Sequence, residues 1–142
     1  MPPWLLYAFL SALAASLVGV LGRIGVKDVN DNLATVVRSA IMTLMLLCFC
    51  TFAGAWKHVG ELRGKALLAI ALSGAAGATS WIFYFKALKL AEVSKVSPID
   101  KLSMPLGILL AVILLSERPS AVNWLGIVMI AGGAYLATVK AA

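Results

Sequence analysis

Residues 93–118 read VSKVSPIDKLSMPLGILLAVILLSER, and this stretch decides how the rest of the chain is interpreted. Its uninterrupted apolar part, Met104–Leu115, is too short to cross a bilayer core of roughly 30 Å, which needs about 20 helical residues. A spanning helix must therefore begin near Val96, and that start places Asp100 and Lys101 inside the membrane. Because an ionisable side chain at such depth is costly, we treat this segment as a candidate functional site.

The composition does not fit an ordinary soluble domain. Of the 142 residues, 62% are hydrophobic and only 13% are charged, and the apolar residues form long blocks separated by short charged strips. These blocks predict an all-α membrane protein, a bundle of five transmembrane helices that makes residues 1–142 a single transmembrane domain. The predicted helices cover about residues 4–21, 33–54, 66–85, 96–115 and 122–139.

Several classes of function find no support in the residues. The net charge of +6 comes from basic residues that lie singly in predicted loops, as membrane topology requires, and not in a patch for nucleic acid. Gly19, Gly22 and Gly25 have the spacing G-x-x-G-x-x-G and no predicted strand precedes them, so they favour helix packing over a dinucleotide-binding loop. No nucleophile–base pair or metal-ligand cluster is apparent, so we expect no enzyme, no catalytic residue, no metal and no cofactor.

Arg38 is a charged residue about five positions inside the second predicted helix, about 7 Å from its start. Its guanidinium either snorkels to the interface or faces the bundle interior, and both interpretations stay open. The second and fourth predicted helices begin on the same side of the membrane, so Arg38 and Asp100 should lie at comparable depth. We therefore expect Arg38 or Lys101 to neutralise Asp100. Asp100 and Lys101 lie about 100° apart on a continuous helix, however, and at that spacing we expect them to pair poorly with each other.

A stripe of small and aromatic-polar side chains follows one face of the third predicted helix, with the spacing i, i+4, i+7, i+8 and i+11. Its members are Ser73, Gly77, Ser80, Trp81 and Tyr84. Such a stripe either lines a pathway or serves close packing, with an aromatic belt near the interface. The sequence leaves both interpretations open.

Prolines and serines accompany the charges of the fourth predicted helix. Pro105 removes one backbone donor and can kink the helix, which leaves carbonyl groups near Lys101 to find other partners. The candidate substrate-binding or pathway residues are Arg38, Ser73, Trp81, Tyr84, Ser97, Pro98, Asp100, Lys101 and Ser103.

The basic residues indicate an orientation in the membrane. With five spans, the side of the N-terminus carries Lys57, Arg63, Lys65 and Arg118. The opposite side carries Arg23, Lys27, Lys86, Lys89, Lys95 and Lys140, apart from the membrane-embedded Arg38 and Lys101. Six residues against four favour an outside N-terminus and an inside C-terminus. The small difference leaves insertion in both orientations open.

Residues 80–137 resemble the EamA domain of the drug/metabolite transporter superfamily. They read SWIFYFKALKLAEVSKVSPIDKLSMPLGILLAVILLSERPSAVNWLGIVMIAGGAYLA. The signature is an apolar run that ends in an acidic residue (LLSE, Leu114–Glu117), a short turn, and then WLGIVMIAGG (Trp124–Gly133). Trp4–Lys27 and Asn32–Arg38 also fit the first half of that unit, so the resemblance covers nearly the whole chain.

The resemblance implies a secondary transporter that exports a small metabolite by alternating access, in the cytoplasmic membrane of a bacterium or archaeon. Many members carry two such units as a ten-helix inverted repeat, whereas this chain is similar to the short five-helix transporters with one. Because inverted-repeat transporters place substrate at the repeat interface, the resemblance implies a homodimer, with an antiparallel arrangement as one option, or a partner subunit. Ser116 stands where the family commonly has Gly, and Pro119 stiffens the following turn.

Two other functions stay open. Cation efflux of the small multidrug resistance type is expected to need an acidic residue in the first helix, and residues 4–21 contain none. A basic-leaning interior would also suit anionic or zwitterionic cargo better than a lipophilic cation. In a different class of function, the chain is a small membrane subunit that scaffolds a partner, with charges that serve only topology. Substitution of Asp100 and Lys101 by alanine distinguishes the two functions. Loss of transport with intact folding supports a transport pathway, and loss of folding alone supports a scaffold.

Overall fold

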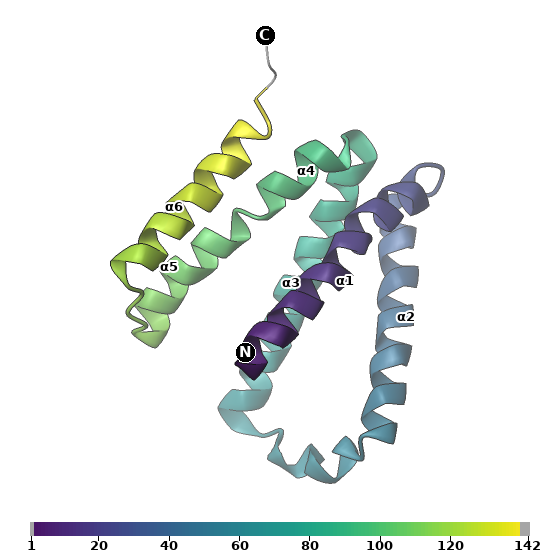
Figure 1. Cartoon of the computed structure of the whole chain (residues 1–142). Coiled ribbons are helices and arrows are strands. Elements are labelled where there is room, and N and C mark those ends of the chain that lie inside the picture. The colour runs from purple at the N-terminus through teal and green to yellow at the C-terminus, as the bar shows by residue number, and fades with distance from the viewer. Residues whose placement is uncertain (1, 140–142) are drawn as a thin grey trace. The chain divides into compact units, whose positions relative to one another are not determined.

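A computed structural model describes residues 2–139, and every regular element in this range is helical (Figure 1). The elements are α1 (Pro3–Val26), α2 (Asp31–Phe52), the 3-10 helix η1 (Ala55–Glu61), α3 (Gly64–Leu90), α4 (Val93–Asp100), α5 (Ser103–Leu115) and α6 (Ala121–Leu136). By length and composition, α1, α2, α3 and the stretch Val93–Leu115 can each cross a membrane, and α6 is a shorter apolar helix. The prediction of an all-helical membrane protein is confirmed. Lys140, which enters the orientation argument, lies outside the described residues.

The helices form two compact units. The terminal unit contains residues 2–20 and 90–139, and the central unit contains Leu21–Lys89. In the terminal unit, α6 contacts both α4 and α5, and α5 and α6 run side by side as a helical hairpin (Figure 1). In the central unit, η1 connects α2 to α3 and contacts α2. Each unit therefore has helical packing of its own.

The central unit is closely packed where the end of α1 meets the end of α3. Val26 and Leu88 have no exposed surface, and Phe85 is also buried. A Cβ atom added at Gly22 would lie 3.3 Å from Leu88 Cδ1 and 3.4 Å from Phe85 Cε1. Arg23 donates a hydrogen bond to the carbonyl group of Leu88. Glycine lets the two backbones approach at this point, so the expectation that this glycine run serves packing is confirmed at Gly22.

The start of α2 is fixed by a side-chain cap and by a lysine from α3. Asn30 Oδ1 accepts hydrogen bonds from the backbone N–H groups of Asn32 and Leu33, which satisfies two donors that the first helical turn leaves open. Lys89 Nζ lies 3.7 Å from Asp31 Oδ1 and donates a 2.9 Å hydrogen bond to the carbonyl group of Val29. These contacts join the α1–α2 loop to the end of α3.

Most large apolar side chains along the helices are exposed on the isolated chain, as Phe9, Leu44 and Ile113 illustrate. A soluble monomer rarely exposes contiguous apolar surface of this extent. The surface fits contact with lipid tails, which are as apolar as these side chains.

The observed helices differ from the predicted ones mainly at their ends. The first and third helices end at Val26 and Leu90, beyond the predicted ends at 21 and 85. Charged residues such as Lys86 continue the last turns because lysine is a good helix former. The predicted helix over 96–115 is present as two helices, α4 and α5.

Ser116 ends α5 in the left-handed conformation, with φ of 57°. A residue with a Cβ atom pays about 1–2 kcal/mol in this conformation, which glycine avoids. We expect Ser116→Gly to raise the free energy of unfolding by about 0.5–1 kcal/mol, since the greater freedom of glycine in the unfolded chain offsets part of the gain. Unfolding in mixed micelles, followed by circular dichroism, measures this change.

Ser80→Gly is the matched control for that substitution, because Ser80 is an exposed residue inside α3. Glycine in a helix interior should lower the free energy of unfolding by about 0.5 kcal/mol. Equal losses from the two substitutions would contradict the assigned role of Ser116.

Candidate functional site

The fourth apolar segment is interrupted within the terminal unit. α4 ends at Asp100 and α5 begins at Ser103, and Figure 1 shows the ribbon uncoiled between them. Pro105 explains the position of the break, since it has no N–H group for the carbonyl of Lys101, and its ring would clash with that carbonyl in a continuous helix. The N–H group of Met104 donates to the Lys101 carbonyl instead, at 3.0 Å. The regular α-helix is therefore interrupted by a tight 3-10-like turn at Lys101 and Leu102, whose backbone stays in the αR region.

Asp100 and Lys101 form an ion pair at this break. Lys101 Nζ lies 3.4 Å from Asp100 Oδ2, and the side chains are 55% and 33% exposed, respectively. The expectation that these neighbours pair poorly was wrong, because the long, flexible lysine side chain reaches the neighbouring carboxylate even though the backbone of Lys101 stays in the αR region. Of the two cations expected to neutralise Asp100, the structure gives Lys101, whereas Arg38 has different neighbours in the central unit.

The other candidates in this segment lie on both sides of the pair. Ser97 and Pro98 are half-buried residues of α4, and the carbonyl of Ser97 accepts the N–H of Lys101 at 3.1 Å. Pro98 lies inside α4 and offers no N–H group to the carbonyl of Ser94. Ser103 is the exposed first residue of α5. The carbonyl of Ser94 therefore loses its usual i+4 donor, whereas the carbonyls of Ser97, Ile99, Lys101 and Leu102 each accept a backbone hydrogen bond.

A second cluster lies in the central unit, where Arg38 of α2 meets three aromatic residues of α3. Arg38 Cζ lies 3.5 Å from the centroid of the Trp81 ring and 5.7 Å from that of Phe85. Trp81 and Tyr84 meet edge to face, with ring centroids 5.6 Å apart and planes at 89°. Residues three and four apart share one face of a helix, so the predicted common face of Trp81 and Tyr84 is confirmed.

The guanidinium of Arg38 is stacked on the Trp81 ring. Its Nη1 atom is buried and has no hydrogen-bond partner among the described residues. The nearby hydroxyl groups of α2 are engaged by their own helix: Thr35 Oγ1 donates to the carbonyl of Asp31 and Ser39 Oγ to that of Thr35, each at 2.8 Å. Arg38 is therefore held against the aromatic side chains of α3, with part of its donor capacity unused.

The structure does not bring Ser73 to this cluster. Ser73 is exposed on α3 and lies two turns before Trp81, about 12 Å along the helix axis. The described residues also hold no group of three or more His, Cys, Asp or Glu side chains that would suit a metal ion. The described candidate residues thus offer two features for binding: an ion pair at the turn between α4 and α5, and a stacked arginine side chain.

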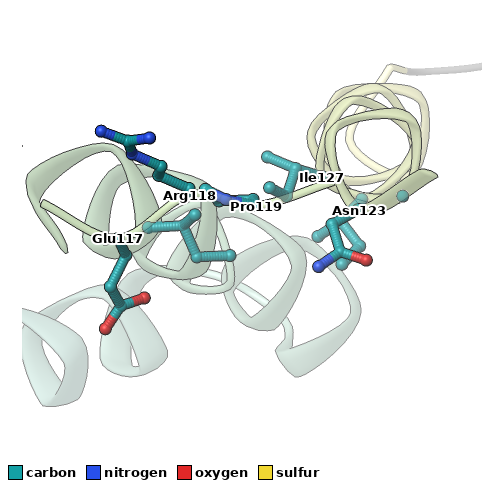
Figure 2. Close-up of a pocket in the computed structure, with 8 residues that line it drawn as sticks. Glu117, Arg118, Pro119, Asn123 and Ile127 are labelled. Carbon is teal, nitrogen blue, oxygen red and sulfur yellow. The ribbon is translucent and has the colours of Figure 1, made fainter. Parts of the chain in front are cut away.

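Sequence reasoning missed an open pocket of about 640 Å³ in the terminal unit, at the turn between α5 and α6. Figure 2 shows the Glu117 and Arg118 side chains pointing to different sides of this turn. The volume falls within the usual range for ligand pockets. Its lining residues are Ile108, Glu117, Arg118, Pro119, Asn123, Gly126, Ile127 and Ile130. The acidic end of the LLSE run was the available signal, since it places a carboxylate beside two apolar helices.

Comparison with known proteins matches the chain along nearly its whole length. The EamA-like transporter family matches residues 2–139. A protein of Sinorhizobium sp., named an uncharacterized transporter in the cobO 3′ region, is 38% identical over 136 residues, which cover 96% of this chain and 96% of that protein. No solved structure matches the chain. The similarity therefore includes the first two helices as well as the segment over residues 80–137.

Proposed function

The chain belongs to the EamA-like transporter family, and from that membership we propose that it is a secondary transporter that exports a small metabolite by alternating access. The family, the similar transporter and four helices able to cross a membrane make the chain a multi-pass integral membrane protein of a transporter family. The metabolite, the export direction and the mechanism are the content of the proposal.

The interruption of the fourth span is the observation that carries this proposal. Lys101 lies about 12 Å along the axis from Val93, within a stretch of 23 residues able to cross a membrane. A proline within a transmembrane helix frees a backbone carbonyl, which neighbouring side chains, water or a local 3-10 adjustment must satisfy. Transporters use interrupted helices to present carbonyl groups and helix ends to their cargo. An ion pair beside such a turn therefore supports a transport pathway over a membrane anchor.

The proposed roles follow the two clusters. In the terminal unit, Asp100 and Lys101 bind the cargo or gate its passage, and the flanking polar and proline residues shape the break. These flanking residues are Ser97, Pro98 and Ser103. In the central unit, Arg38, Trp81 and Tyr84 line the pathway, and Ser73 extends it along α3. Proton coupling through Asp100 is compatible with this arrangement.

We also propose that a second copy of the chain, in antiparallel or parallel orientation, or a partner subunit completes the transporter. The chain matches one EamA unit, and it exposes apolar side chains along every long helix. Inverted-repeat transporters bind cargo between two such halves. The excess of basic residues opposite the N-terminus supports a cytoplasmic C-terminus in a bacterial or archaeal membrane.

Neutralising substitutions test the role of the ion pair. Asp100→Asn and Lys101→Gln should each lower export by about fivefold, which corresponds to roughly 1 kcal/mol in the rate-limiting barrier. Cells that express the chain are screened by mass spectrometry for metabolites released into the medium. The metabolite that rises is then used as the probe in proteoliposomes.

The pair Glu92–Lys95 provides a matched control, because it is another ion pair of the same segment, with 3.2 Å between Lys95 Nζ and Glu92 Oε2, at the start of α4. Glu92→Gln and Lys95→Gln should leave export unchanged. Unchanged export by the Asp100 and Lys101 variants would contradict the pathway. Variants that lose export only because they no longer fold would favour the scaffolding function instead.

A further inference from the structure

Arg38 is a cation inside a membrane span that has no anionic partner in the described residues. The ion pairs found within residues 2–139 join Lys89 to Asp31, Lys101 to Asp100, Lys95 to Glu92 and His58 to Glu61. Asp31, the acidic residue of α2 itself, is thus already held by Lys89. A charge in this position is costly unless another group compensates it.

The aromatic ring beneath Arg38 compensates only part of that cost. Trp81 covers one face of the guanidinium at 3.5 Å, a cation–π contact that attracts the charge to the ring. The N–H donors of arginine radiate from the edge of its plane, however, where a ring face cannot accept them. Nη1 lies on that edge, buried and without an acceptor. Carboxylate and phosphate groups are the anions whose paired oxygens fit such an edge.

The charge balance of the central unit also favours an anion. At the end of the central unit that holds Arg38, residues 21–40 and 81–89 contain five Lys and Arg residues and two Asp and Glu residues. Such an excess produces a positive potential that attracts anions and repels cations. The aromatic residues Trp81, Tyr84 and Phe85 form an apolar wall beside the guanidinium. A ligand with one carboxylate and a small apolar body would match both features.

We infer that Arg38 binds the carboxylate of the transported metabolite, and that its guanidinium stacks on Trp81 while no cargo is bound. This inference rests on the proposed function and names the class of cargo as small organic acids or amino acids. Because Nη1 is covered in this conformation, the carboxylate reaches it only when the guanidinium lifts from the indole ring. Binding should therefore change the surroundings of Trp81.

Tryptophan fluorescence of the full-length chain in detergent tests this directly. Substitution of Trp4, Trp56 and Trp124 by Phe leaves Trp81 as the only tryptophan. The probes are 4-methylpentanoate, leucine, phenylacetate and succinate, each compared with its amide at constant ionic strength, together with inorganic phosphate. We expect a saturable change in Trp81 emission for at least one carboxylate and none for its amide.

Variants of Arg38 identify the group that responds. Arg38→Gln should abolish the change, and Arg38→Lys should weaken binding by about tenfold because lysine keeps the charge but loses the two-pronged geometry. Lys86→Gln is the matched control, since it removes the same charge from an exposed position next to Phe85. If the triple tryptophan variant does not fold, the melting temperature of the otherwise unmodified chain replaces fluorescence, since a ligand that binds the folded state raises it.

The outcomes separate this inference from the proposed function. Equal responses to carboxylates and amides, a response that survives Arg38→Gln, or a response to phosphate alone would overturn the carboxylate assignment. If no carboxylate changes the Trp81 signal while Asp100→Asn still lowers export, the proposed transporter function is supported and the proposed cargo class is contradicted. If carboxylates bind through Arg38 while the Asp100 and Lys101 variants export normally, carboxylate binding at Arg38 is supported and a pathway through the helix break is contradicted.

Discussion

Pro105→Ala is expected to remove most transport while leaving the chain at least as stable as before. Alanine restores the N–H group that a continuous helix needs opposite the Lys101 carbonyl, and it favours the helical state by about 3 kcal/mol over proline. If transport requires the interrupted form of Val93–Leu115, that energy reduces its population by up to about 100-fold. Export from proteoliposomes and unfolding in mixed micelles measure the two effects on the same preparation.

Pro3→Ala is the control for the loss of a proline, since Pro3 is the exposed first residue of α1, where proline interrupts no helical hydrogen bond. It should leave export within about twofold of the unmodified chain, as surface substitutions commonly do. A Pro105→Ala protein that transports normally would show that the break at Lys101 has no part in the mechanism. A protein that loses both transport and fold would instead give Pro105, which is buried, a packing role.

Trp81→Ala is expected to destabilise the central unit strongly. It removes the stacking partner of Arg38 and the ring contacts with Tyr84 and Phe85 at 5.6 and 5.9 Å. Because Trp81 is half-buried, we expect a loss of about 3 kcal/mol, near the lower end for Trp→Ala. Trp81→Phe keeps a ring beneath the guanidinium and should cost about 1 kcal/mol.

Phe83→Ala separates this effect from the general loss of an aromatic ring on α3. Phe83 is exposed on the same helix, and lipid tails can replace its contacts, so the expected loss is below about 1 kcal/mol. Denaturant titration in mixed micelles compares the three variants. Similar losses from Trp81→Ala and Phe83→Ala would mean that the Arg38–Trp81 contact contributes nothing measurable to the fold.

The helical segments were predictable because a bilayer demands long apolar blocks, and each block appears plainly in the sequence. Their ends were less predictable, because polarity alone does not end a helix. Lys86 and Lys89 continue α3, and a side-chain cap at Asn30 marks where α2 begins. Pro105 correctly indicated a kink, and its missing donor points four residues back to Lys101, where the helix is interrupted.

The errors and omissions in the candidate site have one physical origin. The Asp100–Lys101 pair was misjudged because the angle between the two positions on a helix does not account for the reach of a flexible lysine side chain. The contact of Arg38 with Trp81 joins two helices, and periodicity within either helix contains no information on that partner. The pocket at Glu117 likewise depends on how the α5–α6 turn folds back. Sequence patterns identified the chemically relevant residues, whereas tertiary packing determined their partners.

The short length of α6 has a consequence for the surrounding lipid. Its 16 residues measure about 24 Å, less than the roughly 30 Å of an average hydrocarbon core. Lipids adapt to such hydrophobic mismatch by thinning beside the short segment. Where α6 crosses the bilayer, such thinning would bring headgroups and water toward its ends, so Asn123 and the adjoining turn would stay within reach of water although the helix is short.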